Sequence, residues 1–188
     1  MAKFILGKKL GMTTIYDMEK KAQNVTLIEC FSNKISLLKT SEKDGYKAVQ
    51  IEVSKTKKRI VKREFRVAEM GENYEAGKEM EIGQFEIGEK VKVSGITKAK
   101  GFQGVVKRHG FHGSAKTHGH KHDLRAPGSI GSTYPEHVIK GKRMAGRMGG
   151  VRSTVKNVKI AYIDKEKNLL GVKGAVPGIP GGIVEVRA

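Results

Sequence analysis

The chain has 188 residues, which is enough for one domain with a hydrophobic core and an appendage. Its 37 Lys and Arg residues outnumber 19 Asp and Glu residues, and the formal net charge of +18 favours a polyanionic partner such as nucleic acid. No apolar run reaches the length of a membrane span, the N-terminus lacks the apolar stretch of a secretory signal, and the single cysteine suits a reducing compartment. We therefore expect a cytoplasmic protein without a membrane partner.

The first part of the chain carries the pattern of short β-strands. Apolar and polar side chains alternate there, as they do in strands with one buried face. Asp44-Gly45 is a turn signal between two such runs, and a polar turn is expected around Met18–Lys20. The predicted strands lie at 12–17, 25–31 and 46–53 and in two runs within 79–97.

The segment 55–76 is less β-like, and we predict that part of it is helical. Its run "KTKKRIVKREF" is a basic cluster, but four glutamates lie in or just after it, so it is interpreted as a solvated helical face. Strand patterns return near the C-terminus, at 155–164, 168–174 and 182–188. Many short strands with glycine-rich turns predict a mainly β protein, built as a small barrel or sandwich from residues 1–97 and 157–188.

The segment 98–156 differs from both flanks. It holds 13 Lys and Arg residues against two acids, a net charge of +11, together with all six histidines and 11 of the 24 glycines. It lacks sustained apolar periodicity, so we expect it to have no interior of its own and to become rigid only when a partner surrounds it. Interleaved cations replace the counterions of a phosphate backbone, and Phe102, Phe111 and Tyr134 offer faces on which bases stack. This composition predicts an extension that inserts into folded RNA.

The candidate RNA contacts are the basic and histidine side chains of this segment. Glycine lets a backbone approach a phosphate or a base closely. The predicted side-chain contacts are Lys98, Lys100, Lys107, Arg108, His109, His112, Lys116, His118, Lys121, Arg125, Lys140, Lys142, Arg143, Arg147, Arg152 and Lys156. The predicted positions of close backbone approach are Gly101, Gly104, Gly128, Gly131, Gly141, Gly146 and Gly149.

The histidine-rich stretch "RHGFHGSAKTHGHKH" also raises the question of a metal site. His118, His120 and His122 alternate, so an extended strand would place them on one face. A zinc site needs ligands held by a scaffold, and this stretch has no thiol and only Asp123 as a nearby acid. We favour RNA contacts over a metal site; a metal-dependent β-barrel enzyme remains the rival hypothesis.

Other catalytic chemistry has little support in the sequence. The stretch "GKRMAGRMGG" spaces two glycines as in a phosphate-binding loop, but Arg147-Met148 stands where Lys-Ser/Thr is required. Glu136 and His137 are an isolated acid/base pair, and Cys30 lies in an apolar strand pattern that suits a core position. We therefore expect no catalytic residue, no cofactor and no small-molecule substrate.

Long motifs along the chain resemble a known family. The segments "ILGKKLGMTTIYD", "DGYKAVQIEV", "KGFQGVVKRHGF", "RAPGSIG", "KGKRMAGRMGG" and "NLLGVKGAVPG" are similar, in this order and spacing, to the bacterial form of the universal large-subunit ribosomal protein three family. The resemblance spans essentially the whole chain. It implies a translation-factor-like β-barrel with a small α+β insertion and a long, irregular basic extension.

The same resemblance implies a function. Family members are structural constituents of the large subunit that bind its ribosomal RNA early in assembly and lie beside other large-subunit proteins. Their extension reaches toward the peptidyl-transferase centre without supplying a catalytic group, and Lys140–Gly150 would be its inner tip. A nucleic-acid chaperone outside the ribosome is the alternative.

Two features depart from the family pattern. Some relatives carry a glutamine at the position of Arg147 that is methylated in certain bacteria, and an arginine cannot take that modification. The stretch Phe111–Leu124 is richer in histidine than the family pattern, which leaves a metal or pH effect open.

Overall fold

The computed structural model describes residues 3–16, 21–56, 59–69 and 74–188. Its contacts divide the chain into a globular unit, Met1–Thr97 with Arg152–Ala188, and an extension unit, Lys98–Val151. The extension unit begins at the expected residue but ends at Val151 rather than at residue 156. Residues 152–156 belong to a long barrel strand, because hydrogen bonds to a neighbouring strand extend its regular pairing to Arg152.

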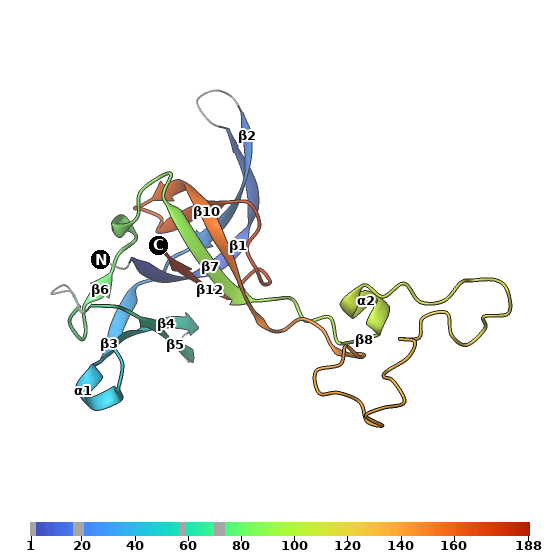
Figure 1. The fold of residues 1–188 in the computed structure, drawn as a ribbon. Coiled ribbons are helices and arrows are strands. Elements are labelled where there is room, and N and C mark those ends of the chain that lie inside the picture. Colours follow the sequence, from blue (N-terminus) through green and yellow to red (C-terminus); the bar gives the residue numbers. More distant parts are fainter. Residues whose placement is uncertain (1–2, 17–20, 57–58, 70–73) are drawn as a thin grey trace. The chain divides into compact units, whose positions relative to one another are not determined.

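Six antiparallel strands of the globular unit close into a barrel (Figure 1). Each strand pairs with the next and the last pairs with the first, so the ring leaves no open edge. Around the barrel the order is β1 (Phe4–Tyr16), β12 (Ile183–Arg187), β7 (Lys90–Ile96), β10 (Arg152–Asp164), β11 (Leu169–Lys173) and β2 (Ala22–Glu29).

Alternation along the strands fills the barrel interior. On β7, Val91 and Val93 are buried whereas Lys90 and Lys92 are exposed. On β12, Val184 and Val186 are buried in the same core cluster. The prediction of a mainly β protein is confirmed, and the closed ring of strands distinguishes a barrel from a sandwich.

A second sheet packs against the outside of β1. Its order is β5 (Arg59–Arg66), β4 (Ala48–Thr56), β3 (Asn33–Lys39) and β6 (Glu79–Met80). Phe4 and Leu6 of β1 join its buried side chains in one apolar cluster, in which the rings of Phe4 and Phe65 stack with centroids 4.6 Å apart. This cluster fixes the sheet to the barrel.

A buried amide ties β1 to the start of β3. The side-chain oxygen of Asn33 accepts a hydrogen bond from the Leu6 backbone N–H at 2.9 Å. Its amide nitrogen donates to the carbonyls of Leu6 at 3.0 Å and Phe31 at 2.6 Å. The side chain thereby pairs with three backbone groups at the junction between the two sheets.

The helical prediction for 55–76 is wrong for the described residues of that segment. β4 reaches Thr56 and β5 covers Arg59–Arg66, with Val61 opposite Val53 and Phe65 opposite Val49. Apolar cross-strand pairs stabilise this hairpin against a helix that would leave Phe65 without a core. Short helices lie elsewhere in the globular unit: α1 (Ser41–Asp44) ends at Gly45, and a 3-10 turn covers Ile82–Gln84.

The turn predicted at Met18–Lys20 lies outside the described residues. Among the residues that are described, no helix is long and apolar enough to cross a membrane.

Candidate nucleic-acid interface

The extension unit contains one small ordered motif. Strand β8 (Phe102–Gln103) pairs with β9 (Gly146–Arg147), and α2 (Val105–His109) follows β8 directly. Beyond the two strands, the Lys100 N–H donates to the Met148 carbonyl and the Met148 N–H donates to the Gly101 carbonyl, both at 2.9 Å. We call residues 98–110 with 144–149 the β8–α2–β9 motif.

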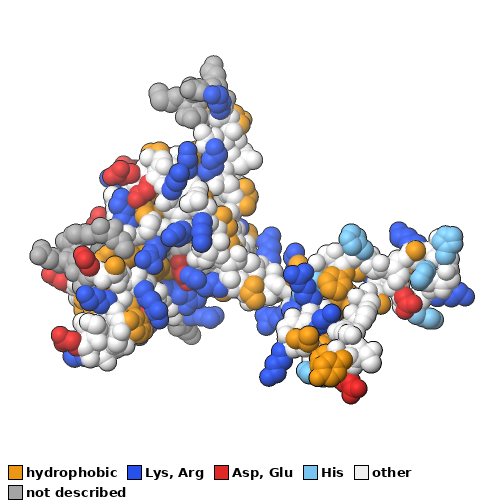
Figure 2. Space-filling model, in the orientation of Figure 1, with side chains coloured by type: hydrophobic (Ala, Val, Ile, Leu, Met, Phe, Trp, Pro, Cys, Tyr) orange, Lys and Arg blue, Asp and Glu red, His pale blue; other side chains and the backbone are white. Residues whose placement is uncertain are grey.

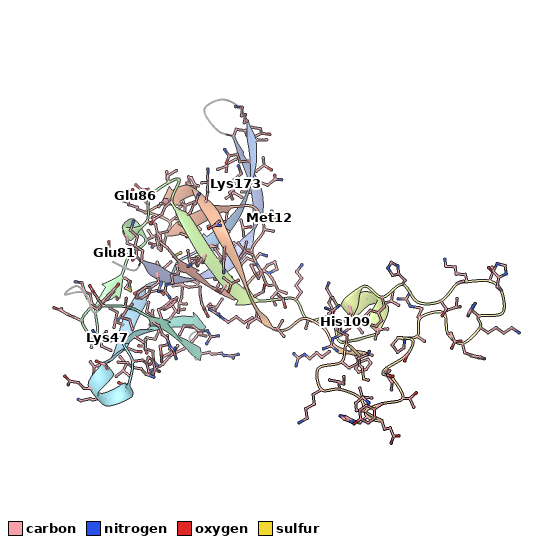
Figure 3. The ribbon with its side chains drawn as sticks, viewed as in Figure 1. Met12, Lys47, Glu81, Glu86, His109 and Lys173 are labelled. Atoms are coloured by element: carbon pink, nitrogen blue, oxygen red, sulfur yellow. The ribbon has the colours of Figure 1, made fainter. Side chains whose placement is uncertain are left out.

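Two predicted RNA contacts help to hold this motif together. Arg108 donates from Nη1 to the Met144 carbonyl at 2.6 Å, and the His109 ring donates from Nε2 to the same oxygen at 3.0 Å. Figure 3 labels His109 at α2, of which it is the last residue. Sequence reasoning missed these roles, because no local pattern pairs a helix at 105–109 with a carbonyl at 144.

The extension unit has almost no interior. Val105, 3% exposed, is its only buried residue, and residues 111–143 form no helix or strand. The expectation of a segment without any interior is therefore wrong for the β8–α2–β9 motif. Over residues 111–143 no residue is buried.

Basic and histidine side chains are spread over the face of the extension unit that Figure 2 shows, and acidic ones are scarce there. Its 11 Lys and Arg residues face two acids, Asp123 and Glu136, which gives a net charge of +9. Among the described residues, no lysine or arginine of this unit forms an ion pair with an acid. The exposed cations predicted as RNA contacts are Lys98, Lys100, Lys107, Lys116, Lys121, Arg125, Lys140, Lys142, Arg143 and Arg147.

Apolar side chains are also exposed in this unit. Phe102 is 76% and Tyr134 87% exposed. Phe102 lies directly opposite Arg147 across the β8–β9 pair, so an aromatic ring and a guanidinium share one face of that short sheet. Exposed aromatic rings beside cations are typical of surfaces that bind unpaired nucleotides.

At one of the glycines predicted to let the backbone approach RNA, the close neighbour is the protein's own backbone. A Cβ at Gly149 would lie 2.0 Å from the Lys98 carbonyl oxygen, at a φ of +71°. Gly113, which sequence reasoning did not select, is constrained in the same way by the Leu124 carbonyl at 2.2 Å. By contrast, a Cβ at Gly101, Gly104, Gly128, Gly131 or Gly141 would meet no atom within 4 Å.

The three alternating histidines considered as a metal site do not lie in an extended strand. His118 has a φ of +61° and lies in a turn, so His118, His120 and His122 are not on one face of a strand. Among the described residues, no group of three or more His, Cys, Asp or Glu side chains is placed to hold a metal ion.

Two further predicted contacts lie outside the extension unit. Arg152 and Lys156 are part of β10, and the Arg152 guanidinium forms an ion pair with Glu185 of β12. Lys156 is exposed at a bulge, where the register with β7 shifts between Val155 and Val158. The basic run that these residues continue in sequence is interrupted in structure by the start of the barrel strand.

Comparison with known proteins identifies the family. A sequence model described as "Ribosomal protein L3" matches residues 7–175. A relative from Nitrosococcus oceani, named large ribosomal subunit protein uL3, is 44% identical, with 100% of this chain and 96% of the relative aligned. Proteins of the same name from Prochlorococcus marinus (strain MIT 9515) and Leifsonia xyli are 46% and 47% identical, each over 97% of this chain and 92% of the relative.

The match covers both units of the fold, since the family model runs from β1 through the whole extension into the loop after β11. Proteins of this family are structural components of the ribosome, so this protein is not an enzyme. The chain is a member of the ribosomal protein L3 family.

Proposed function

We propose that this protein is a structural constituent of the large ribosomal subunit that binds large-subunit ribosomal RNA through its extension unit. It supports early subunit assembly on ribosomes of the cytoplasm, beside neighbouring large-subunit proteins. The extension lies toward the peptidyl-transferase centre, with Lys140–Gly150 at its inner tip. The globular unit, a barrel of the translation-factor kind, holds the extension at its point of entry into the RNA.

The observation that carries this proposal is the charge of a segment without a core. The extension unit bears a net charge of +9, and its only buried residue is Val105. A chain of this composition gains little from folding on itself, since it has almost no apolar surface to bury. Phosphate groups supply the missing stabilisation, because each one neutralises a cation and releases a condensed counterion.

The details of the unit suit RNA better than a featureless polyanion. Exposed aromatic rings at Phe102 and Tyr134 offer stacking faces for unpaired bases, which folded RNA displays in loops and bulges. The β8–α2–β9 motif keeps an ordered backbone at the two ends of the unit, and residues 111–143 remain free to follow the RNA surface.

The test replaces two exposed cations of the proposed tip, Lys142→Ala with Arg143→Ala. Each phosphate contact contributes about 0.7 to the slope of log affinity against log salt for single strands, so losing two flattens the slope by about 1.4. Filter binding of the full chain to large-subunit ribosomal RNA at several salt concentrations measures the slope. Lys43→Ala with Lys167→Ala, two exposed lysines of the globular unit, is the matched control. A slope that is unchanged relative to the control contradicts RNA binding by this segment.

Two further measurements separate the rival functions. Sedimentation of the endogenous protein with large subunits through a high-salt gradient supports a ribosomal constituent, whereas its release to the top supports a nucleic-acid chaperone. Stoichiometric zinc retained by tag-free protein through dialysis would favour the metal-dependent rival.

A further inference from the structure

The globular unit contains a basic cleft that is lined by its own residues alone. It has a volume of about 620 Å³ and lies between β5 of the second sheet and three neighbouring barrel strands, β7, β10 and β12, which Figure 1 labels. Five cations line the cleft, together with Glu64 and Glu185. The cations are Arg63, Arg66, Lys92, Arg152 and Arg187.

Strand register explains why these side chains meet. On β7, Val91 and Val93 fill the barrel, so the alternating Lys92 and Ser94 point outward. Arg187 of β12 lies opposite Lys92. Glu185 and Thr154 lie opposite Ser94 on its two sides, from β12 and β10. One outer face of the barrel therefore collects charged and hydroxyl side chains that are remote in sequence.

Glu185 prearranges two of the arginines. Its side chain is only 15% exposed, and one carboxylate oxygen forms an ion pair with Arg63, 3.2 Å from Nε. The other oxygen pairs with the guanidinium of Arg152. A guanidinium has five N–H donors in a rigid fork, so each arginine keeps donors that this carboxylate does not use. The pairing restricts both side chains without neutralising the cleft.

The remaining charges leave the cleft positive. Glu64 is paired outside the cleft lining, with Lys39 at 3.0 Å, and this hydrogen-bonded pairing lowers the pKa of the Glu64 carboxyl. Lys92 and Arg187 have no acidic ion-pair partner among the described residues, although they lie opposite each other on adjacent strands. Like charges in that position repel, and an anion between them would relieve the repulsion.

We propose that this cleft is a second RNA-binding site, which takes the phosphate backbone of ribosomal RNA on the globular unit. This inference rests on the proposed function, because it assumes that the chain is bound to large-subunit RNA. Arginine forks and hydroxyl groups match phosphate oxygens. The Ser94 and Thr154 hydroxyls are hydrogen-bonded to each other at 2.7 Å, so the pair keeps one O–H as a neutral donor between the cations. Arg152, predicted from sequence as an extension contact, acts in this cleft instead.

An acidic protein segment is the competing occupant. Protein interfaces are usually anchored by a buried apolar or aromatic side chain. The cleft lining offers one exposed apolar side chain for such an anchor to contact, Ile96, which is 50% exposed at the end of β7. Backbone phosphates need no such anchor, since their recognition depends on cations and hydrogen-bond donors.

The first test neutralises the two cations without ion-pair partners, Lys92→Gln with Arg187→Gln, in the full chain. Loss of two phosphate contacts flattens the salt slope for large-subunit ribosomal RNA by about 1.4 relative to the unaltered chain. The control, Lys43→Gln with Lys167→Gln, changes charge equally on exposed positions outside the cleft and leaves the slope unchanged. A cleft variant that behaves like its control overturns the inference. If Lys142→Ala with Arg143→Ala flattens the slope in the same assay, the proposed function still stands.

The second test removes no charge and locates the RNA directly. A single cysteine at the cleft, Ile96→Cys, carries an iron chelate that cleaves nearby RNA; Cys30 stays unlabelled because it is buried and its thiol pKa is raised to about 12. A second chain carries the chelate at Ser129→Cys in the extension unit. Both chains are bound to large-subunit ribosomal RNA with its ribosomal proteins. Cleavage from both positions, at different nucleotides, supports the cleft site.

Comparing the two labelled positions distinguishes failure of the cleft site from failure of the proposed function. Cleavage from Ser129→Cys alone overturns the cleft site and leaves the proposed function intact. The absence of cleavage from either position contradicts both. A further sample carries a photoreactive crosslinker at Ile96→Cys in place of the chelate. Its crosslinking to a ribosomal protein, with no RNA cleavage by the chelate, assigns the cleft to a protein partner and also overturns the inference.

Discussion

Replacing Val105 with alanine tests whether the extension unit has a folded motif of its own. Val105 is 3% exposed and is the only buried residue between Lys98 and Val151. The change removes two buried carbon groups, which costs about 1.6 kcal/mol at about 0.8 kcal/mol each, before any cavity term. A two-residue strand pair and a five-residue helix have no stability alone, so the motif depends on this burial. At about 1.4 kcal/mol per tenfold, the motif should open roughly 15-fold more often.

Hydrogen exchange of the full chain without RNA measures this opening. The amides of Arg108, Gly110 and Met148 are hydrogen-bonded within the motif and should exchange roughly 15-fold faster in Val105→Ala. Barrel amides should keep their rates, because the substitution lies in the other unit. Val106→Ala removes the same atoms at a half-buried position and should have a smaller effect. Equal exchange in the two variants, or faster exchange throughout the barrel, would refute the reasoning.

Three more outcomes follow from individual contacts. Gly149→Ala should abolish hydrogen-exchange protection of the β8–α2–β9 motif, because the added Cβ would lie 2.0 Å from a backbone carbonyl oxygen. Gly141 also has a positive φ but lies in open space, so Gly141→Ala should leave that protection intact. Asn33→Ala should lower the free energy of unfolding by about 3 kcal/mol in denaturant titration, since buried backbone groups lose their partners; the exposed Asn24→Ala should change it little, and equal effects would contradict the role of Asn33. The thiol of Cys30 should not react with a thiol reagent at pH 8 until the protein unfolds, because burial raises its pKa to about 12 and keeps it protonated; stoichiometric reaction of the native protein would argue against that burial.

The barrel strands were the most predictable part of the fold. Runs such as Val91–Val93 and Val184–Val186 alternate clearly, and each lies in a strand with its valines inside. The hairpin β4–β5 was missed because the many lysines and glutamates of residues 55–76 give this segment only a weak local preference for a β-strand. Its strand structure depends on pairs such as Val61 with Val53, which local sequence does not reveal.

The candidate interface was predictable in composition and less so in detail. Charge counting alone located the basic segment, and the lysines and arginines of residues 98–151 form no ion pair with an acid in the described structure. It assigned Arg152 and Lys156 to the wrong unit, because a basic barrel strand and a basic extension look alike in sequence. It also assigned Arg108 and His109 to RNA alone, although both bind the Met144 carbonyl.

The sequence by itself determined the class of fold and the location of the basic extension, since alternation and composition are properties of neighbouring residues. Only the tertiary structure decided that the strands close into a barrel and that Arg63, Lys92, Arg152 and Arg187 line one cleft. The register between β7, β10 and β12 sets that grouping. Register arises from pairings between residues far apart in the chain, and no local pattern encodes which strand lies beside which.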